Sequence, residues 1–291
     1  MHYNSRKMSG SGDEGENRQL RAEIRRLRET LRKLTPSLEV ILRRRGFSIY
    51  KREPKDDLLV PAGDLLDGYY VMLKHYSFRL FLRDAIKHQR GFTLPQVTRY
   101  ATREVTTEYL RYLEKIGLVK PGDSGYTLAG GTIKSFGETL EWFIAEIFRR
   151  ELSAEAIWGI KMKRPRVGGD YDLLAKIDGS VLCMEVKSSP PKQIYQTEIR
   201  TFLDRICDLR PEIAVFFVDT ELRMKDKIVP MFEEEMSRRF VPPPEVRRME
   251  RELFEVSEQV CESSRVFIIN AKDSIIQNIE RVLIEYFRRT L

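Results

Sequence analysis

The 291-residue sequence is poor in the residues that build several common kinds of site. It has only three cysteines and three histidines. Cys183, Cys207 and Cys261 are odd in number, widely spaced and without a C-x-x-C pair, so the sequence predicts neither a disulfide framework nor a zinc knuckle. Three scattered histidines cannot build a zinc hydrolase site. The glycine patterns of phosphate-binding and dinucleotide-binding loops are also missing.

Long apolar runs are absent as well. The longest run covers residues 213–218, far short of the roughly 18 to 20 residues that a membrane helix needs. Residues 1–16 are polar, with no apolar stretch behind their basic residues, so they predict a disordered tail and not a secretory signal. With 42% hydrophobic and 33% charged residues, the composition is typical of a globular protein. We therefore expect a cytoplasmic protein that does not associate with a membrane.

Positive charge is concentrated near the start of the chain. The formal net charge is +7, and residues 18–52 carry 12 Lys and Arg against 3 Asp and Glu. Such a block attracts polyanions, with nucleic acid or an anionic membrane surface as the usual partners. A helix whose arginines are only solvated explains the same composition. The sequence leaves both interpretations open.

Residues 17–67 combine a short heptad pattern with a connector. Five apolar residues have the 4-3-4-3 spacing of a coiled-coil seam: Leu20, Ile24, Leu27, Leu31 and Leu34. Because the pattern spans barely two heptads, a homodimer formed through this basic helix and a helix packed on its own chain both remain open. We expect the helix to end near Pro36.

Residues 68–131 have the pattern of a small helical domain closed by a hairpin. A helix over residues 68–89 is followed by a short helix that Thr93 caps. A further helix is expected over 105–116, and residues 118–128 predict a β-hairpin. The first helix presents its apolar residues mostly to one side, as a packed helix does.

This order of elements resembles a winged helix-turn-helix. The span carries 10 Lys and Arg against 5 Asp and Glu, and we expect its third helix to expose Arg103, Thr106, Thr107, Tyr109, Arg111 and Tyr112. The resemblance implies DNA contacts from the following residues: Arg99, Arg103, Thr106, Thr107, Arg111 and Lys120. A winged helix that contacts only proteins has the same element order, so this alternative stays open.

Residues 136–187 contain the acidic and basic side chains that most strongly indicate a catalytic or metal-binding site. An amphipathic helix over residues 136–148 precedes three expected strands, 156–162, 171–177 and 181–186, of which the last two form a hairpin. Side chains alternate along a strand, so Glu185 and Lys187 share a face, and the hairpin brings Asp172 alongside Glu185. Two neighbouring carboxylates repel unless a cation lies between them, and hard oxygen ligands suit Mg²⁺. A cross-strand salt bridge on a solvated edge is the alternative.

The Asp…Glu-x-Lys arrangement, preceded by a Glu-bearing helix and two glycines, resembles the PD-(D/E)xK nuclease superfamily. The resemblance covers about residues 135–291. It implies an α/β (α+β) fold of the restriction-endonuclease-like type, in which helices flank a mixed central sheet. Asp172 and Glu185 would bind Mg²⁺, for which Mn²⁺ can substitute, together with the backbone carbonyl of Val186. Lys187 would be the catalytic lysine.

Further residues follow from the same resemblance. Glu141 corresponds to an acidic residue on the first helix that reaches the metal through water. Asp170 shares the face of Asp172 and can substitute as a ligand, whereas the family's Pro before the Asp is replaced by Tyr171. Gln193 and Gln196 lie where some relatives use a Gln to orient substrate, although a polar helix start explains them equally well.

The remainder of the expected nuclease-like domain, residues 132–291, completes the sheet. A helix is predicted over residues 193–209, a buried strand over 213–218, and a closing strand and helix over 266–270 and 274–287. Residues 219–265 are interpreted as an insertion in which three prolines, 242–244, separate two charged helices.

The sequence thus predicts a Mg²⁺-dependent DNA endonuclease whose winged helix positions double-stranded DNA. Two other functions fit the same residues. One is a non-catalytic DNA-binding regulator or scaffold built on a nuclease fold, and the other is a nuclease that acts on structured RNA. Cleavage in the presence of Mg²⁺ separates the first alternative from the prediction, and the choice of substrate separates the second.

Overall fold

The computed structural model describes residues 20, 23, 26, 27, 30, 35–122, 125–163, 166–257, 260, 261 and 264–288. The expected disordered tail and most of the heptad pattern lie outside these residues. Of the five heptad positions, Leu20 and Leu27 are described, and both are exposed. The coiled coil and the homodimer therefore stay predictions.

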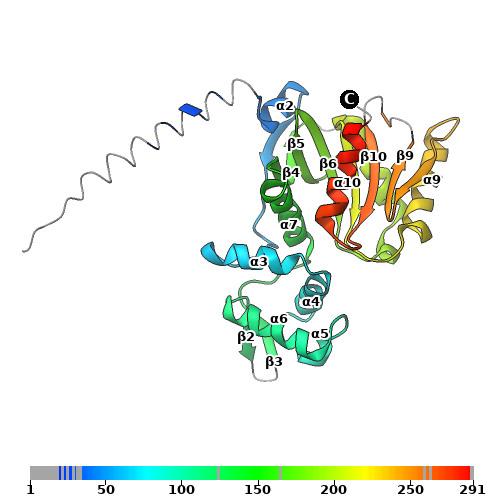
Figure 1. Ribbon diagram of the computed structural model, residues 1–291. Coiled ribbons are helices and arrows are strands. Elements are labelled where there is room, and N and C mark those ends of the chain that lie inside the picture. The colour runs from blue at the N-terminus through cyan, green and yellow to red at the C-terminus, as the bar shows by residue number, and fades with distance from the viewer. Residues whose placement is uncertain are drawn as a thin grey trace, which may run out of the picture.

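An eight-stranded mixed sheet flanked by helices forms the larger part of the structure (Figure 1), which confirms the expected fold class. The strand order is β1-β4-β5-β6-β7-β10-β9-β8. The neighbours β6, β7 and β10 run parallel, and the other pairs are antiparallel. The strands are β1 (Ser48–Lys51), β4 (Glu155–Lys163), β5 (Tyr171–Ile177), β6 (Ser180–Lys187), β7 (Ile213–Val218), β8 (Val246–Glu250), β9 (Leu253–Val256) and β10 (Arg265–Asn270).

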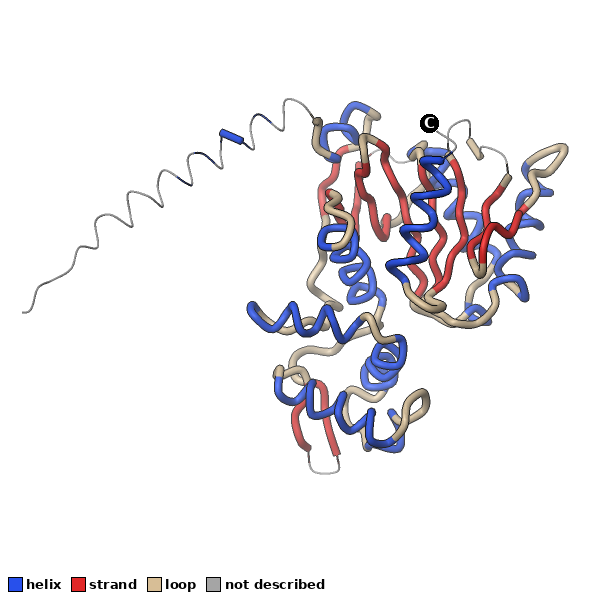
Figure 2. Tube along the Cα trace, in the orientation of Figure 1, coloured by secondary structure: helices blue, strands red, loops and turns tan. Residues whose placement is uncertain are grey.

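Helices cover both faces of this sheet (Figure 2). One face packs against α7 (Gly137–Arg150) and α10 (Ile275–Arg288), and the other against α8 (Gln196–Leu209) and α9 (Ile228–Arg239). Alternation along β7 explains the division, since Val215 belongs to the core under α7 and α10 while Phe216 belongs to the core under α8 and α9. Within the part of the chain that the structure describes, no helix combines the length and apolar character needed to cross a membrane.

A smaller group of helices lies below the sheet, beyond the ends of its strands and next to α7 (Figure 1). It consists of α3 (Leu66–Leu73), α4 (Tyr76–Lys87), α5 (Leu94–Val97), α6 (Arg103–Lys115) and the hairpin of β2 (Val119–Gly122) and β3 (Gly125–Leu128). The expectation of a single helix over residues 68–89 is wrong. His75 adopts an extended conformation, and Arg79 donates to the carbonyls of Leu73 and Lys74. These contacts satisfy the end of α3 and separate it from α4.

The helical group and the sheet share one hydrophobic core. Tyr69 of α3 lies 6.2 Å from Trp142 of α7 between ring centroids, and Tyr70 lies 5.5 Å from Phe143. Part of the segment interpreted as a connector also joins the sheet, because it supplies α2 (Leu38–Arg44) and the edge strand β1, which pairs with β4.

The segment 219–265 differs from its prediction. A helix, α9, precedes the prolines as expected, but the hairpin β8–β9 replaces the second charged helix. Leu253, Phe254 and Val256 are buried, and β9 pairs with β10. Pairing with an open sheet edge and burial of these side chains outweigh the helical preference of the charged residues.

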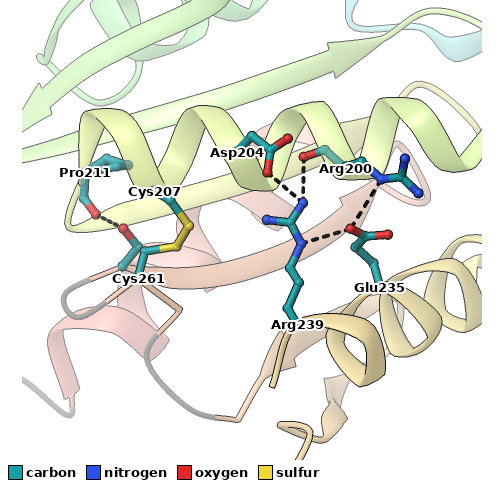
Figure 3. The surroundings of a disulfide bond; sticks show 8 residues. Arg200, Asp204, Cys207, Pro211, Glu235, Arg239 and Cys261 are labelled. Carbon is teal, nitrogen blue, oxygen red and sulfur yellow. Dashed lines mark hydrogen bonds and ion pairs between the residues drawn. A yellow bond between two sulfur atoms is a disulfide. The ribbon is translucent and has the colours of Figure 1, made fainter. Parts of the chain in front are cut away.

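Cys207 and Cys261 form a disulfide, which the sequence did not indicate. The bond joins α8 to the connection between β9 and β10, 54 residues further along the chain (Figure 3). Beside it, Arg239 of α9 contacts Asp204 of α8 at 2.7 Å and Glu235 at 2.9 Å. The two cysteines are far apart in the sequence, and only the packing of α8 against the β9–β10 connection brings them together.

Candidate active site

The pairing of β5 with β6 places the predicted carboxylates side by side. Leu173 pairs with Met184, so Asp172 and Glu185 form the next cross-strand pair, where side chains on the same face are neighbours. The amide of Val186 donates to Asp172 Oδ2 at 2.7 Å. Lys187 Nζ lies 2.8 Å from Glu185 Oε1. The structure therefore brings Asp172, Glu185 and Lys187 together as the sequence predicts.

These carboxylates are electrostatically strained. Burial, followed by the charge of Glu185, raises the pKa of Asp172 to about 8. Burial alone would lower the pKa of Lys187, but the charges of Glu185 and Asp172 raise it above its usual value. Lys187 is accordingly protonated near neutral pH and acts as a cation.

Glu141 approaches the same place from α7. Its pKa is raised to about 9 by burial first and then by the charge of Asp172. Gly159 lies opposite Asp172 on β4, since its neighbours pair with residues on either side of Asp172. With φ of +55°, Gly159 tolerates a side chain poorly, and a Cβ there would collide with Pro54 and stand 3.7 Å from Glu141 Oε2. The glycine therefore makes room for Pro54, and the Glu141 carboxylate lies in ordinary van der Waals range of the same stretch of β4.

Helix α8 contributes two charged residues that the sequence did not single out. Glu198 Oε2 lies 2.9 Å from Lys187 Nζ, and Arg205 Nη1 lies 3.1 Å from Glu185 Oε2. The result is an alternating chain of charges, Glu198, Lys187, Glu185 and Arg205. Their spacing of seven residues, two helical turns, puts Glu198 and Arg205 on one face of α8. The sequence spacing alone indicates that Glu198 and Arg205 share a helix face, but it does not indicate that this face contacts Lys187 and Glu185.

The glycine before Asp170 accommodates Arg205. Gly169 has φ of +110°, and a Cβ at this position would collide with the Arg205 guanidinium. The same guanidinium lies 5.8 Å from the centroid of the Tyr171 ring. Arg205 Nε is buried and has no hydrogen-bond partner among the described residues. The segment of residues 168–172 thus contacts the Arg205 guanidinium of α8 through Gly169 and Tyr171, and it also carries Asp172.

Both oxygens of Glu185 contact cations, and this limits what the site can enclose in the present arrangement. Across the described ranges, no three Asp, Glu, His or Cys side chains are grouped so that they could hold a metal ion together. Lys187 contacts one oxygen of Glu185 and Arg205 the other. Each oxygen keeps a further lone pair, so a metal shared by Glu185 and Asp172 would bind beside these two cations.

The remaining predicted site residues lie at varying distances from this cluster. Asp170 is exposed and pairs with Lys161 at 3.1 Å, so its service as a substitute ligand stays a prediction. Gln193 is exposed on a short turn before α8. The amide of Gln196 donates to the carbonyl of Met231 on α9, which directs it to helix packing instead of substrate. Val186 contributes its amide to Asp172, and metal binding through its carbonyl stays a prediction.

Helix α6 exposes a different face from the one expected. Arg99, Arg103, Arg111 and Lys120 are exposed. Thr106 is 1% exposed and its hydroxyl donates to the carbonyl of Thr102, so its placement on the outer face is wrong. Thr107 is half-buried and its hydroxyl donates to the carbonyl of Arg103, and Tyr109 is buried.

Packing against α4 buries this face of α6. The Tyr109 ring lies edge-on against Phe78 of α4, with 5.0 Å between the ring centroids. Tyr112, also expected outside, is half-buried.

Comparisons with known proteins give distant structural similarities. No family model and no curated protein matches the sequence. The structure is similar to that of Can2 from Sulfobacillus thermosulfidooxidans in complex with cyclic tetra-adenylate, with a TM-score of 0.49 and 13% identity, covering 86% of this chain and 61% of that one. It is also similar to protein VC1899 from Vibrio cholerae, with a TM-score of 0.40 and 12% identity, covering 66% of this chain and 54% of that one. The chain spans less than two thirds of either protein.

Proposed function

We propose that this protein is a metal-dependent nuclease that hydrolyses phosphodiester bonds in DNA. The observation that carries the proposal is the cross-strand placement of Asp172 beside Glu185, with the cation of Lys187 in contact. Raised carboxylate pKa values with a specific charged partner are concentrated at functional sites. The order of residues, Asp, then Glu and Lys two apart at a strand end, resembles the PD-(D/E)xK superfamily.

The donor set fits Mg²⁺ or Mn²⁺. Asp172 and Glu185 offer hard carboxylate oxygens. Burial first and then the charge of Glu185 raise the pKa of Asp172, and a divalent cation between the two groups would favour the ionised form of both. The carbonyl of Val186 and, through water, Glu141 would complete the ligands. Such an ion lowers the pKa of a bound water and offsets charge on phosphate oxygens.

The other residues of the cluster have distinct roles in this proposal. Lys187 remains protonated and stabilises the negative charge that develops on the scissile phosphate. Glu198 holds the Lys187 ammonium from the helix side, and Arg205 holds Glu185. Glu198 and Arg205 are therefore positioning residues, because each acts through another side chain.

The helical group would bind the DNA as a winged helix. Its support is the order α4, α5, α6 and hairpin, together with the exposed residues Arg99, Arg103, Arg111 and Lys120. The exposed face of α6 carries Glu104, Glu108 and Glu114 as well as basic residues. This mixture favours phosphate contacts at the start of α6 and at the hairpin over contacts along the whole helix.

One observation favours a second candidate, a DNA-binding regulator without catalysis. Both Glu185 oxygens contact cations of the chain itself, and these cations offset the carboxylate charge that would attract a metal. The two candidates differ in a single measurable property, cleavage that depends on a divalent cation.

The test is incubation of the purified protein with duplex, branched and single-stranded DNA and with structured RNA, in Mg²⁺, Mn²⁺ or a chelator. We expect metal-dependent cleavage of DNA, and a fall in rate of roughly 10³-fold or more in Asp172→Ala, Glu185→Ala and Lys187→Ala. DNA affinity should persist in all three variants.

Asp178→Asn is the matched control. Asp178 is an exposed acidic residue in the turn at the other end of the β5–β6 hairpin, with φ of +48°, a conformation that Asn also tolerates. The control should cleave at the wild-type rate. DNA binding without cleavage under every metal condition would establish the regulator, and cleavage of RNA alone would replace DNA as the substrate.

A further inference from the structure

A second set of buried charges joins the helical group to the sheet. Arg79 of α4 is 1% exposed, and Asp219, directly after β7, is fully buried. Arg79 Nε and Nη2 donate to Asp219 Oδ1 at 3.0 and 2.8 Å. Arg83 Nη2 adds contacts of 2.7 Å to Asp219 Oδ2 and 2.8 Å to its carbonyl. We call these three residues the Asp219 junction.

The Asp219 junction reaches the candidate active site through the backbone. The amide of Asp219 donates to the carbonyl of Lys187 at 2.8 Å, so the ends of β6 and β7 are fixed together. On the opposite side, Arg79 Nη1 donates to the carbonyls of Leu73 and Lys74 at the end of α3. Asp219 and Arg79 together therefore connect α3 and α4 to the strand that carries Glu185 and Lys187.

Stability alone does not explain such a junction. Removing two guanidinium groups and a carboxylate from water is costly, and apolar residues of similar size often stabilise a fold equally well. The apolar contacts between α3 and α7 already attach the helical group to the sheet. The junction restricts how the helical group can be oriented relative to the sheet. A planar guanidinium that donates two hydrogen bonds to one carboxylate allows few relative orientations of the two groups.

We infer that Arg79, Arg83 and Asp219 are positioning residues that set the orientation of the nucleic-acid-binding helices relative to the catalytic cluster, and so fix where bound DNA is cut. The inference rests on the proposed function of both parts. It adds to that function a specific determinant of cut position that lies outside the catalytic cluster and outside the DNA-binding surface. None of the three residues touches substrate in this account.

The test compares Asp219→Asn with the wild type on a DNA duplex whose binding position is mapped by footprinting. Asparagine keeps the size of the side chain and removes its charge. We expect kcat to fall by about 10- to 100-fold, as for a small misplacement of bound substrate, with cuts spread over several positions and with footprint and DNA affinity unchanged. Hydrogen exchange should become faster at α4 and at the end of β6.

Glu255→Gln is the matched control for the loss of a buried ion pair. Glu255 of β9 is 3% exposed and pairs with Arg265 of β10, and β9 lies beside the edge strand β8, at some distance from the helical group (Figure 1). This variant should lose stability as well but keep the cut position, the kcat and the exchange rates at α4. If both variants lose cleavage in proportion to their loss of stability, with cut positions unchanged, the junction is only structural and the inference is wrong.

Arg83→Met is a milder variant that tests the same inference if Asp219→Asn does not fold. It leaves the Arg79 contacts to Asp219 in place, and we expect the same spread of cuts to a smaller degree. Unchanged cut positions and unchanged exchange at α4 in Arg83→Met would also contradict the inference. If the wild type proves not to cleave nucleic acid at all, the proposed function fails, and the exchange measurements alone decide whether the junction orients the helical group.

Discussion

At the carboxyl ends of the central strands β6 and β7, two neighbouring groups of buried carboxylates differ in the charges that surround them. At the Asp219 junction, burial alone would raise the pKa of Asp219, but the charges of Arg79 and Arg83 lower it below its usual value of 3.8. In the proposed catalytic cluster of Asp172, Glu185 and Lys187, burial and a neighbouring carboxylate raise the pKa of Asp172 to about 8. The Asp219 carboxylate contacts two arginines, whereas the Asp172 carboxylate lies beside the carboxylate of Glu185.

The difference separates a group of charges that fixes orientation from a group proposed to bind a metal. A buried charge with complete partners fixes geometry and tolerates little change. A buried carboxylate pair with incomplete partners costs stability in the folded state, and such local conflicts are concentrated at functional sites. Breaking each group in turn should therefore shift stability in opposite directions.

The largest effect is expected at the junction. Asp219→Asn leaves Arg79 and Arg83 without their anion and should lower the free energy of unfolding by about 3 to 5 kcal/mol. Urea denaturation followed by circular dichroism measures the change, with Asp178→Asn as the control that should match the wild type. A loss no larger than that of the control would show that the junction is not a balanced structural contact.

The catalytic cluster should respond in the other direction. In buffer with a metal chelator, Asp172→Asn removes a carboxyl group whose ionisation is opposed by burial and by the charge of Glu185, and it keeps a side-chain oxygen for the amide of Val186. We expect the free energy of unfolding to rise by about 1 kcal/mol, the usual gain when a conflicted functional residue is replaced. The same denaturation experiment tests this. Destabilisation would mean that Asp172 is held mainly as a structural hydrogen-bond acceptor.

The smallest effect is a pH dependence specific to the junction. Because the pKa of Asp219 is lower in the folded state than its ordinary 3.8, ionised Asp219 stabilises the fold fully above that pH. The contribution is lost as the pH falls through the folded-state pKa. The stability difference between wild type and Asp219→Asn should thus be constant from neutral pH down to about 4 and narrow below it. A difference that stays constant on further acidification would contradict the assigned charge.

Local patterns predicted much of the fold and the centre of the site. Alternation and the Asp178-Gly179 turn gave the β5–β6 hairpin, and with it the pairing of Asp172 and Glu185. The apolar run at 213–218 gave β7. These features depend on residues close together in the sequence, where strand geometry leaves few choices.

Contacts between distant elements were not predictable in the same way. Arg205 and Glu198 become part of the cluster only because α8 packs over β6, and Asp219 meets Arg79 across 140 residues of sequence. The disulfide of Cys207 and Cys261 and the hairpin β8–β9 depend on tertiary packing as well. Thr106 was misplaced because the buried face of α6 is chosen by aromatic residues of α4, which helical periodicity alone does not identify.

The most direct test of the central claim, that Asp172 and Glu185 together bind a divalent cation, is calorimetric titration with Mn²⁺. We predict that the wild type and Asp178→Asn bind the ion with the same affinity, and that Asp172→Asn does not bind it. A parallel thermal melt should show the wild type stabilised by about 2.7 kcal/mol at a free ion concentration of about 100 times Kd, by mass action. Equal binding by Asp172→Asn and the wild type would contradict the account.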